Sequence, residues 1–162
     1  MKLKDNFFVF TVLFVLFIQF SGFSQSNQAE VKALSRGADV ILTGKVTKQQ
    51  SAWVQNKSRI ITQTTVQVSE YLKGTGTNGY VVINHPGGEI DGVGELYSHM
   101  PEFQNDEEVL LFLKKDKTGN DYKVFAGEEG KISLLKDNSG EIVTASRVPL
   151  NSLKAQIKSY TE

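Results

Sequence analysis

The stretch from Arg59 to Leu72 alternates between two kinds of residue, and this alternation constrains the fold more than any other feature of the chain. A period of two residues is that of a β-strand with one buried face and one solvated face. The sequence therefore predicts a long strand in a sheet that is wet on one side. The apolar or β-branched parity holds Ile60, Thr62, Thr64, Val66 and Val68, and the polar parity holds Gln63, Thr65, Gln67 and Ser69.

Further strands are predicted where aliphatic and β-branched residues cluster between turn residues. Residues 39–47 form such a segment, interrupted by Gly44, which is typical of a bulge or sharp bend. Residues 80–83 are a continuous apolar run with the length of a buried strand. Two hairpins follow in succession. Their strands are residues 108–113, 122–125, 132–135 and 142–144, and their turns are 116–120 and 137–140.

Helices are predicted at both ends of this β-rich region. The first covers residues 28–36, where Val31 and Leu34 are three apart, and ends at Gly37. The second covers residues 149–160 and opens on a proline. In it Leu150, Leu153 and Ile157 recur at helical spacing, so we expect this helix to dock on the sheet.

The N-terminus has the pattern of an export leader. Lys2 and Lys4 precede an apolar run over residues 7–20, which is shorter than the roughly 20 residues that a membrane anchor needs. Gly22 and Ser24 suit the small-residue subsites of a signal peptidase, so residues 1–24 are predicted to be a cleaved signal peptide. The remaining chain, 25–162, is then a single domain, exported to the periplasm or the medium, with no membrane insertion after cleavage.

Cysteine content and charge exclude several classes of function. The chain has no cysteine, which removes disulfides, thiolate metal sites and a cysteine nucleophile. Losing Lys2, Lys4 and Asp5 with the leader changes a balance of 18 basic and 18 acidic residues to 16 and 17, a net charge of −1. Because nucleic-acid binding is driven by positive charge, no nucleic-acid partner is expected.

Two polar or glycine-rich segments, residues 48–58 and 84–105, are predicted to be long loops and the contact surface of the protein. Loops of this length in a compact domain are often functional. In the first, Trp53 offers an aromatic ring that either anchors a protein or glycan or folds back over the end of the domain. In the second, the candidate binding residues are Gly87, Gly88, Glu89, Asp91 and Tyr97.

The same second loop carries the alternative hypothesis of a metal-dependent or carboxylate-based hydrolase. His85 and His99 flank three carboxylates, those of Glu89, Asp91 and Glu95. Fourteen residues rich in glycine do not fix two imidazoles as regular structure does, so a solvated loop without metal is the preferred interpretation. No serine nucleophile elbow, phosphate-binding loop or dinucleotide fingerprint occurs. We therefore expect no cofactor and a non-enzymatic binding module.

An ordered set of short motifs resembles a family of exported bacterial domains of uncharacterised function. The set is listed by its positions: 38–40 (Ala-Asp-Val), 44–46 (Gly-Lys-Val), 71–74 (Tyr-Leu-Lys-Gly), 86–88 (Pro-Gly-Gly) and 107–113 (Glu-Glu-Val-Leu-Leu-Phe-Leu). More distantly, residues 38–127 resemble the netrin-like module of the tissue inhibitors of metalloproteinases.

The resemblance implies an all-β fold, an oligonucleotide/oligosaccharide-binding (OB) or netrin-like barrel of five to six strands, partly open, with a short helix at each end. It also implies contact with a protease or another protein of the cell envelope, and a glycan is the other partner considered. The inhibitors chelate the protease zinc through an N-terminal cysteine, which this chain lacks. Inhibition by that route is excluded, and fold alone does not assign another.

Overall fold

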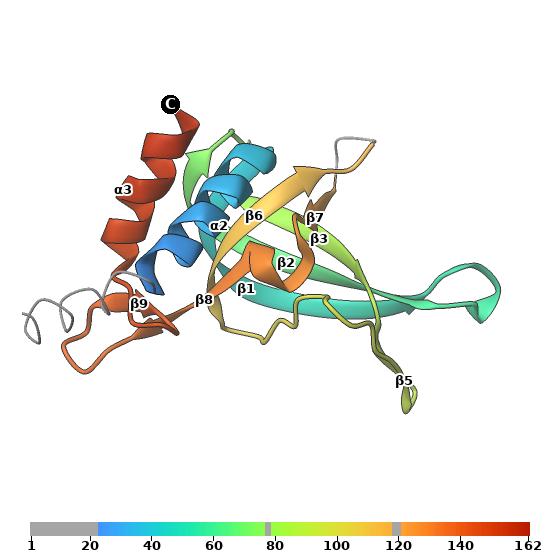
Figure 1. Ribbon diagram of the computed structural model, residues 1–162. Coiled ribbons are helices and arrows are strands. Elements are labelled where there is room, and N and C mark those ends of the chain that lie inside the picture. Colours follow the sequence, from blue (N-terminus) through green and yellow to red (C-terminus); the bar gives the residue numbers. More distant parts are fainter. Residues whose placement is uncertain (1–22, 77–78, 118–120) are drawn as a thin grey trace, which may run out of the picture. The chain divides into compact units, whose positions relative to one another are not determined.

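The structure is a computed structural model that describes residues 23–76, 79–117 and 121–162 (Figure 1). The predicted signal peptide, apart from its last two residues, lies outside the described residues, as does part of the turn predicted at 116–120. The chain divides into two units, one ending at Ala33 and the other running from Leu34 to Glu162. Among the described residues, no helix has the length and apolar character needed to cross a membrane.

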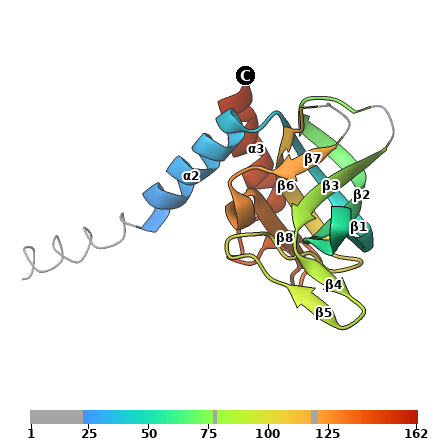
Figure 2. The ribbon, with the colours of Figure 1, turned by 90° about the vertical axis from the view of Figure 1, so that its right-hand side faces the viewer.

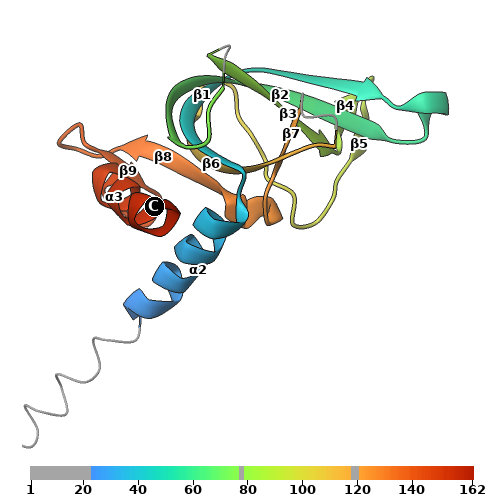
Figure 3. The same ribbon diagram turned by 90° about the horizontal axis from the view of Figure 1, so that it is seen from above.

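Five strands of the second unit close into a barrel. In chain order they are β1 (Val40–Trp53), β2 (Ile60–Lys73), β3 (Tyr80–Pro86), β6 (Glu108–Lys115) and β7 (Tyr122–Val124). Around the ring the order is β1, β2, β3, β7, β6, and β6 pairs with β1 to complete it (Figure 3). Neighbours are antiparallel except β3 and β7, which are parallel. The predicted β-rich barrel, with one helix before its strands and one after them in the chain, is confirmed. The ring of strands is closed, whereas a partly open one was expected.

The predicted strand at 59–72 is confirmed as β2, with the expected division between faces. Ile60, Thr62, Thr64 and Val66 are buried, whereas Gln63 and Gln67 on the opposite parity are exposed. The buried parity points toward the barrel core because successive side chains alternate across the strand.

Gly44 marks an irregularity in β1, as the sequence predicts. The pairing of β1 with β2 shifts register between Thr43 and Gly44. A Cβ atom at Gly44 would lie 2.4 Å from the backbone oxygen of Gln67, so only glycine allows the two strands to approach this closely. This shift lets one long strand pair with β2 along its length and with β6 over its first half.

The barrel interior is aliphatic. Its core contains residues from all of the long strands together with Phe103, which comes from the segment before β6. Strand β6 is buried on both faces, since Val109, Leu110, Leu111, Phe112 and Leu113 are all fully buried. The continuous apolar run at 108–113 therefore reflects a strand at the centre of the structure.

The second predicted hairpin and the C-terminal helix are also confirmed. Strands β8 (Lys131–Lys136) and β9 (Ile142–Thr144) are antiparallel and extend the sheet from β6, after the short 3₁₀ helix η2 (Gly127–Gly130). Helix α3 (Leu150–Thr161) lies beside β9 (Figure 3) and buries the three predicted side chains, those of Leu150, Leu153 and Ile157. Its Lys154 pairs with Glu70, near the C-terminal end of β2.

The Lys73-Gly74 turn at the end of β2 caps a helix. Helix α2 (Phe23–Gly37) ends at the predicted glycine but is longer than the predicted 28–36. The Lys73 ammonium donates to the backbone oxygens of Ser35 at 2.9 Å and Ala38 at 2.7 Å. A cation at these carbonyls offsets the negative end of the helix dipole.

The two segments predicted as long loops contain more regular structure than expected. Strand β1 continues to Trp53, and the 3₁₀ helix η1 (Gln55–Lys57) then leads to β2, so most of residues 48–58 form a two-stranded extension of the barrel. Residues 84–105 begin within β3 and include the hairpin of β4 (Gly88–Ile90) and β5 (Val93–Glu95). Backbone pairing thus replaces irregular loop in both places.

The strand predicted to be buried at 80–83 is buried on one face only. Val81 and Ile83 are buried, whereas Tyr80 remains 52 % exposed. Both parities are apolar here, so the run itself does not separate a strand buried on two faces from one buried on a single face.

Candidate functional site: a pocket at one end of the barrel

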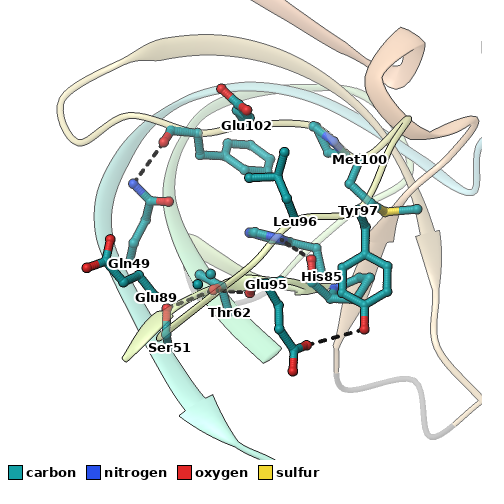
Figure 4. Close-up of a pocket in the computed structure, with 16 residues that line it drawn as sticks. Gln49, Ser51, Thr62, His85, Glu89, Glu95, Leu96, Tyr97, Met100 and Glu102 are labelled. Carbon is teal, nitrogen blue, oxygen red and sulfur yellow. Dashed lines mark hydrogen bonds between the residues drawn. The ribbon is translucent and has the colours of Figure 1, made fainter. Parts of the chain in front are cut away.

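A pocket of about 470 Å³ is lined by residues of the β4–β5 hairpin. Figure 2 shows this hairpin at one end of the barrel. Strand β1 contributes Gln49 and Ser51, β2 contributes Thr62, and β3 contributes His85 and Pro86. The remaining lining residues come from the chain that follows β3, in the ranges 87–89, 94–97 and 100–103 (Figure 4). The size is within the range of small-ligand and side-chain sites.

Phe103 and His85 form the inner wall of the pocket. Phe103 is 8 % exposed and also belongs to the barrel core, so one ring separates the core from the pocket. The His85 ring lies 5.6 Å from it, centroid to centroid. The His85 Nε2 atom lies 3.2 Å from the hydroxyl of Thr64, and Gln49 Nε2 donates to the backbone oxygen of Phe103 at 3.0 Å. The His85 ring is therefore held by Thr64 of β2, and the backbone at Phe103 is held by Gln49 of β1.

The Gly87-Gly88 pair allows the backbone to pass close to β1 and β2. The Thr62 hydroxyl donates to the Gly87 oxygen at 2.7 Å and lies 2.9 Å from the hydroxyl of Ser51. Gly88 has φ of 130°, and a Cβ atom there would lie 2.2 Å from the Thr62 hydroxyl. Glycine is needed for both the backbone conformation and the contact.

Exposed apolar side chains surround the opening. Leu96 is 92 % exposed, Tyr97 is 41 % exposed and Met100 is 37 % exposed. Glu95 accepts hydrogen bonds from the backbone N–H of Ile60 at 2.9 Å and from the Tyr97 hydroxyl at 3.3 Å, which anchors this rim to β2. Leu96 thus projects into solvent next to Glu95, which is held by these hydrogen bonds.

The pocket is lined by carboxylates and lacks basic side chains. Glu89, Glu95 and Glu102 stand on different sides of the opening (Figure 4), and no lysine or arginine is among the lining residues. Burial lowers the pKa of His85 below its ordinary value of 6.5, and a hydrogen bond to the Pro86 carbonyl only partly offsets this. His85 is therefore neutral at pH 7, and the charged side chains that line the pocket are all acidic.

A partly buried ion pair supports the segment that carries Phe103. Lys131 on β8 contacts Glu107 at 2.7 Å, with side chains only 11 % and 15 % exposed, and its ammonium lies 5.2 Å from the Phe103 ring centroid. Burial alone would raise the pKa of Glu107, but hydrogen bonds from Lys131, Ser133 and the Gln104 backbone outweigh it and lower the pKa. The charge of Lys131 is thus already matched.

The structure brings together four of the six predicted binding residues. Gly87, Gly88, Glu89 and Tyr97 line the pocket, although the first two act by giving the backbone its path. Asp91 does not line it. With Gly92 it forms the two-residue turn of the β4–β5 hairpin, both with positive φ, as a type I′ turn requires.

Trp53, the sixth predicted residue, is half-buried at the end of β1, paired with Ile60, and is not among the pocket-lining residues.

The residues of the metal alternative are separated. His85 lines the pocket, whereas the His99 side chain is 84 % exposed and its Nδ1 lies 3.7 Å from Glu128. Within residues 23–76, 79–117 and 121–162, no group of three or more His, Cys, Asp or Glu side chains is placed to hold a metal ion. The hydrolase alternative requires all five side chains to converge; His85, Glu89 and Glu95 line the pocket, whereas Asp91 and His99 do not.

Sequence reasoning missed several lining residues. Gln49, Ser51 and Thr62 were assigned to strand or loop by their pattern, since nothing in sequence indicates that β1 and β2 extend past the barrel end. Leu96 and Met100 lie in a segment of mostly glycine and polar residues. The only available signal is that Leu96-Tyr97 is an apolar pair in a segment otherwise poor in apolar residues.

Together, the fold and the site define a closed five-stranded β-barrel with an open, acidic pocket and an apolar rim at one end. A comparison of the chain with protein-family models finds no matching family, and a comparison with curated proteins finds no match.

Proposed function

We propose that the protein is an exported, non-enzymatic binding module that contacts a protein of the cell envelope or medium through the pocket at the barrel end. The observation that carries the proposal is the exposed apolar rim, in which Leu96 is 92 % exposed beside Tyr97 and Met100. Large apolar side chains gathered at a concave opening are typical of contact surfaces.

The geometry also favours recognition over catalysis. Two of the polar lining groups serve to hold neighbouring chain: the Thr62 hydroxyl donates to the Gly87 oxygen, and the Glu95 carboxylate accepts from the Ile60 N–H and the Tyr97 hydroxyl. A general acid or base needs a free position within hydrogen-bond reach of a substrate, together with a tuned partner. A rigid wall with an apolar rim suits a binding role.

Export rests on the leader pattern, and a protein partner such as a protease rests on the resemblance to exported and netrin-like domains. The chain expressed with its full sequence is expected to be recovered from the envelope or medium, and mass spectrometry is expected to place its N-terminus at Gln25. Recovery of the intact chain from the cytosol would contradict the export proposal.

Partner capture tests the binding role. Protein purified in this way is cross-linked in an envelope extract of the producing organism as wild type, as Leu96→Asp and as Leu135→Asp. Leu135 is a matched control because it is 55 % exposed on β8, away from the pocket. Since a charge on the rim cannot enter an apolar contact, Leu96→Asp is expected to lose the partner by about tenfold or more.

The control variant is expected to capture the partner as the wild type does, and thermal unfolding should show that both variants are folded. Equal capture by all three proteins would overturn the proposed use of this pocket.

A further inference from the structure

The proposed function does not specify the chemistry of the partner. The charge distribution of the pocket indicates which sign of charge the partner carries. Three of the lining residues carry a carboxylate and none carries an ammonium or guanidinium group. Lys131, the cation beside Phe103, is already paired with Glu107 at 2.7 Å. An anionic ligand would meet uncompensated repulsion here, whereas a cationic one meets complementary charge.

The positions of the carboxylates add a geometric constraint. Glu89 and Glu102 are exposed and stand on different sides of the opening, with Leu96 and Tyr97 on the rim as well (Figure 4). Lysine and arginine combine an aliphatic stem with a charged end, so the stem packs on apolar surface while the end reaches a carboxylate. A rim of mixed apolar and acidic character matches such side chains better than purely apolar ones.

The backbone beside the pocket favours an extended partner. Strand β5 pairs with β4 on one side, and among the described residues no strand pairs with its other side. Gly94, in the middle of β5, has no atom closer than 4.0 Å to the position of an added Cβ. A free strand edge next to a pocket allows an extended segment to add its backbone while its side chains enter the pocket.

We propose that the pocket binds an extended, lysine- or arginine-containing segment of the partner protein. The stems of the basic side chains pack on Leu96, Tyr97 and Met100, and their charged ends face Glu89 and Glu102. This inference rests on the proposed function and specifies its partner.

The test measures direct binding of defined probes to the purified protein by fluorescence anisotropy. The probes are a labelled nonapeptide of alternating lysine and threonine, the same peptide with glutamate for lysine, and a hexamer of N-acetylglucosamine. The lysine peptide is expected to bind at least about tenfold more tightly than the glutamate peptide, and to weaken as NaCl rises from about 20 to about 300 mM.

Paired variants locate the binding. Glu89→Gln combined with Glu102→Gln is expected to weaken the lysine peptide about three- to tenfold, because two exposed ion pairs are lost. Glu129→Gln combined with Glu141→Gln removes the same charge from exposed positions outside the pocket lining and is expected to leave the affinity unchanged. Leu96→Ser is expected to weaken the peptide without changing its salt dependence.

Three results would overturn the inference: equal affinity for the two peptides, equal loss in both paired variants, or tighter binding of the sugar hexamer than of the lysine peptide. Capture from the envelope extract separates this failure from failure of the proposed function. If capture of the partner is lost with Leu96→Asp but kept with Glu89→Gln and Glu102→Gln, the protein is a binding module whose partner does not bind through a basic segment. If Leu96→Asp captures the same proteins as the wild type, the proposed binding role of the pocket is wrong.

Discussion

At the scale of single residues, the pocket depends on two positions with unusual constraints, Gly88 and His85. Gly88 has positive φ and no room for a side chain, and His85 is neutral because it is partly buried against Phe103. Neither constraint is visible in the sequence, where a Pro-Gly-Gly run predicts a turn and a lone histidine predicts little.

Gly88→Ala is expected to destabilise the protein by about 2–3 kcal/mol, because it adds backbone strain and pushes apart the hydroxyls of Ser51 and Thr62. The control is Gly92→Ala, whose φ is also positive but which has nothing within 4 Å of an added Cβ. That variant should lose about 1 kcal/mol. Urea unfolding measures both, and equal losses would show that the contacts at Gly88 do not matter.

His85 is expected to make stability depend on pH. Its pKa in the folded protein is below 6.5, because burial disfavours the imidazolium and the hydrogen bond to Pro86 compensates only in part. The unfolded chain then binds a proton first, so the free energy of unfolding is highest above pH 6.5 and falls as the pH drops below it.

The measurement is urea unfolding between about pH 7.5 and pH 5, where exposed carboxylates stay ionised. His85→Gln should flatten the profile. A wild-type profile without slope in this range would contradict the buried neutral imidazole.

At the scale of elements, the segment 96–107 is positioned by its attachments, since it has no regular structure of its own. Gln49 holds Phe103, and Glu107 is held by Lys131 and Ser133 of β8. The Asp106 N–H also donates to the Val46 oxygen at 2.9 Å. Side chains from β1 and β8 thus fix the wall of the pocket.

Lys131→Met is expected to cost about 1–2 kcal/mol, because it leaves the partly buried Glu107 carboxylate without its cation. Adding Glu107→Gln should recover most of the loss, since the neutral amide still accepts from Ser133. A double-mutant cycle by urea unfolding measures the coupling. If the second change deepened the loss additively, the two side chains would not be acting as a pair.

The elements that the sequence predicts well are those with a regular spacing of apolar residues or with clear turn residues at their ends. The alternation of 60–69 predicts β2, the helical spacing of Leu150, Leu153 and Ile157 predicts α3, and the turn residues predict both hairpins. Lengths are less predictable. Strand β1 runs through the polar residues up to Trp53 because β2 continues beside it, and partner strands are not encoded locally.

The site is less predictable than the fold for the same reason. Asp91, predicted to bind, lies in a hairpin turn with Gly92 and does not line the pocket, and turns and binding sites use the same residue types. The pocket exists because β1, β2 and β3 reach the same barrel end, which is information about register rather than composition.

At the scale of the whole molecule, the fold is stabilised without covalent cross-links, since the chain has no cysteine. Strand β6 is apolar on both faces, and the strands form a closed ring, so the fold buries a large apolar core. Small secreted domains that lack such a core often rely on disulfides instead. Adding a thiol reductant should therefore leave the folded state unchanged.

The ring is closed unevenly. Among the described residues, β1 and β2 pair along most of their length, whereas β3 and β7 meet at one parallel pair, Ile83 with Tyr122, supported by the Asn84 amide donating to Asp121 at 2.7 Å. Such a seam opens more cheaply than the rest of the cylinder. Among the barrel strands, amide hydrogen exchange followed by NMR should therefore be fastest at β7. Asn84→Ala should accelerate exchange at β7 while β1 and β2 stay protected. Uniform protection of all five strands would mean that the barrel opens only by global unfolding.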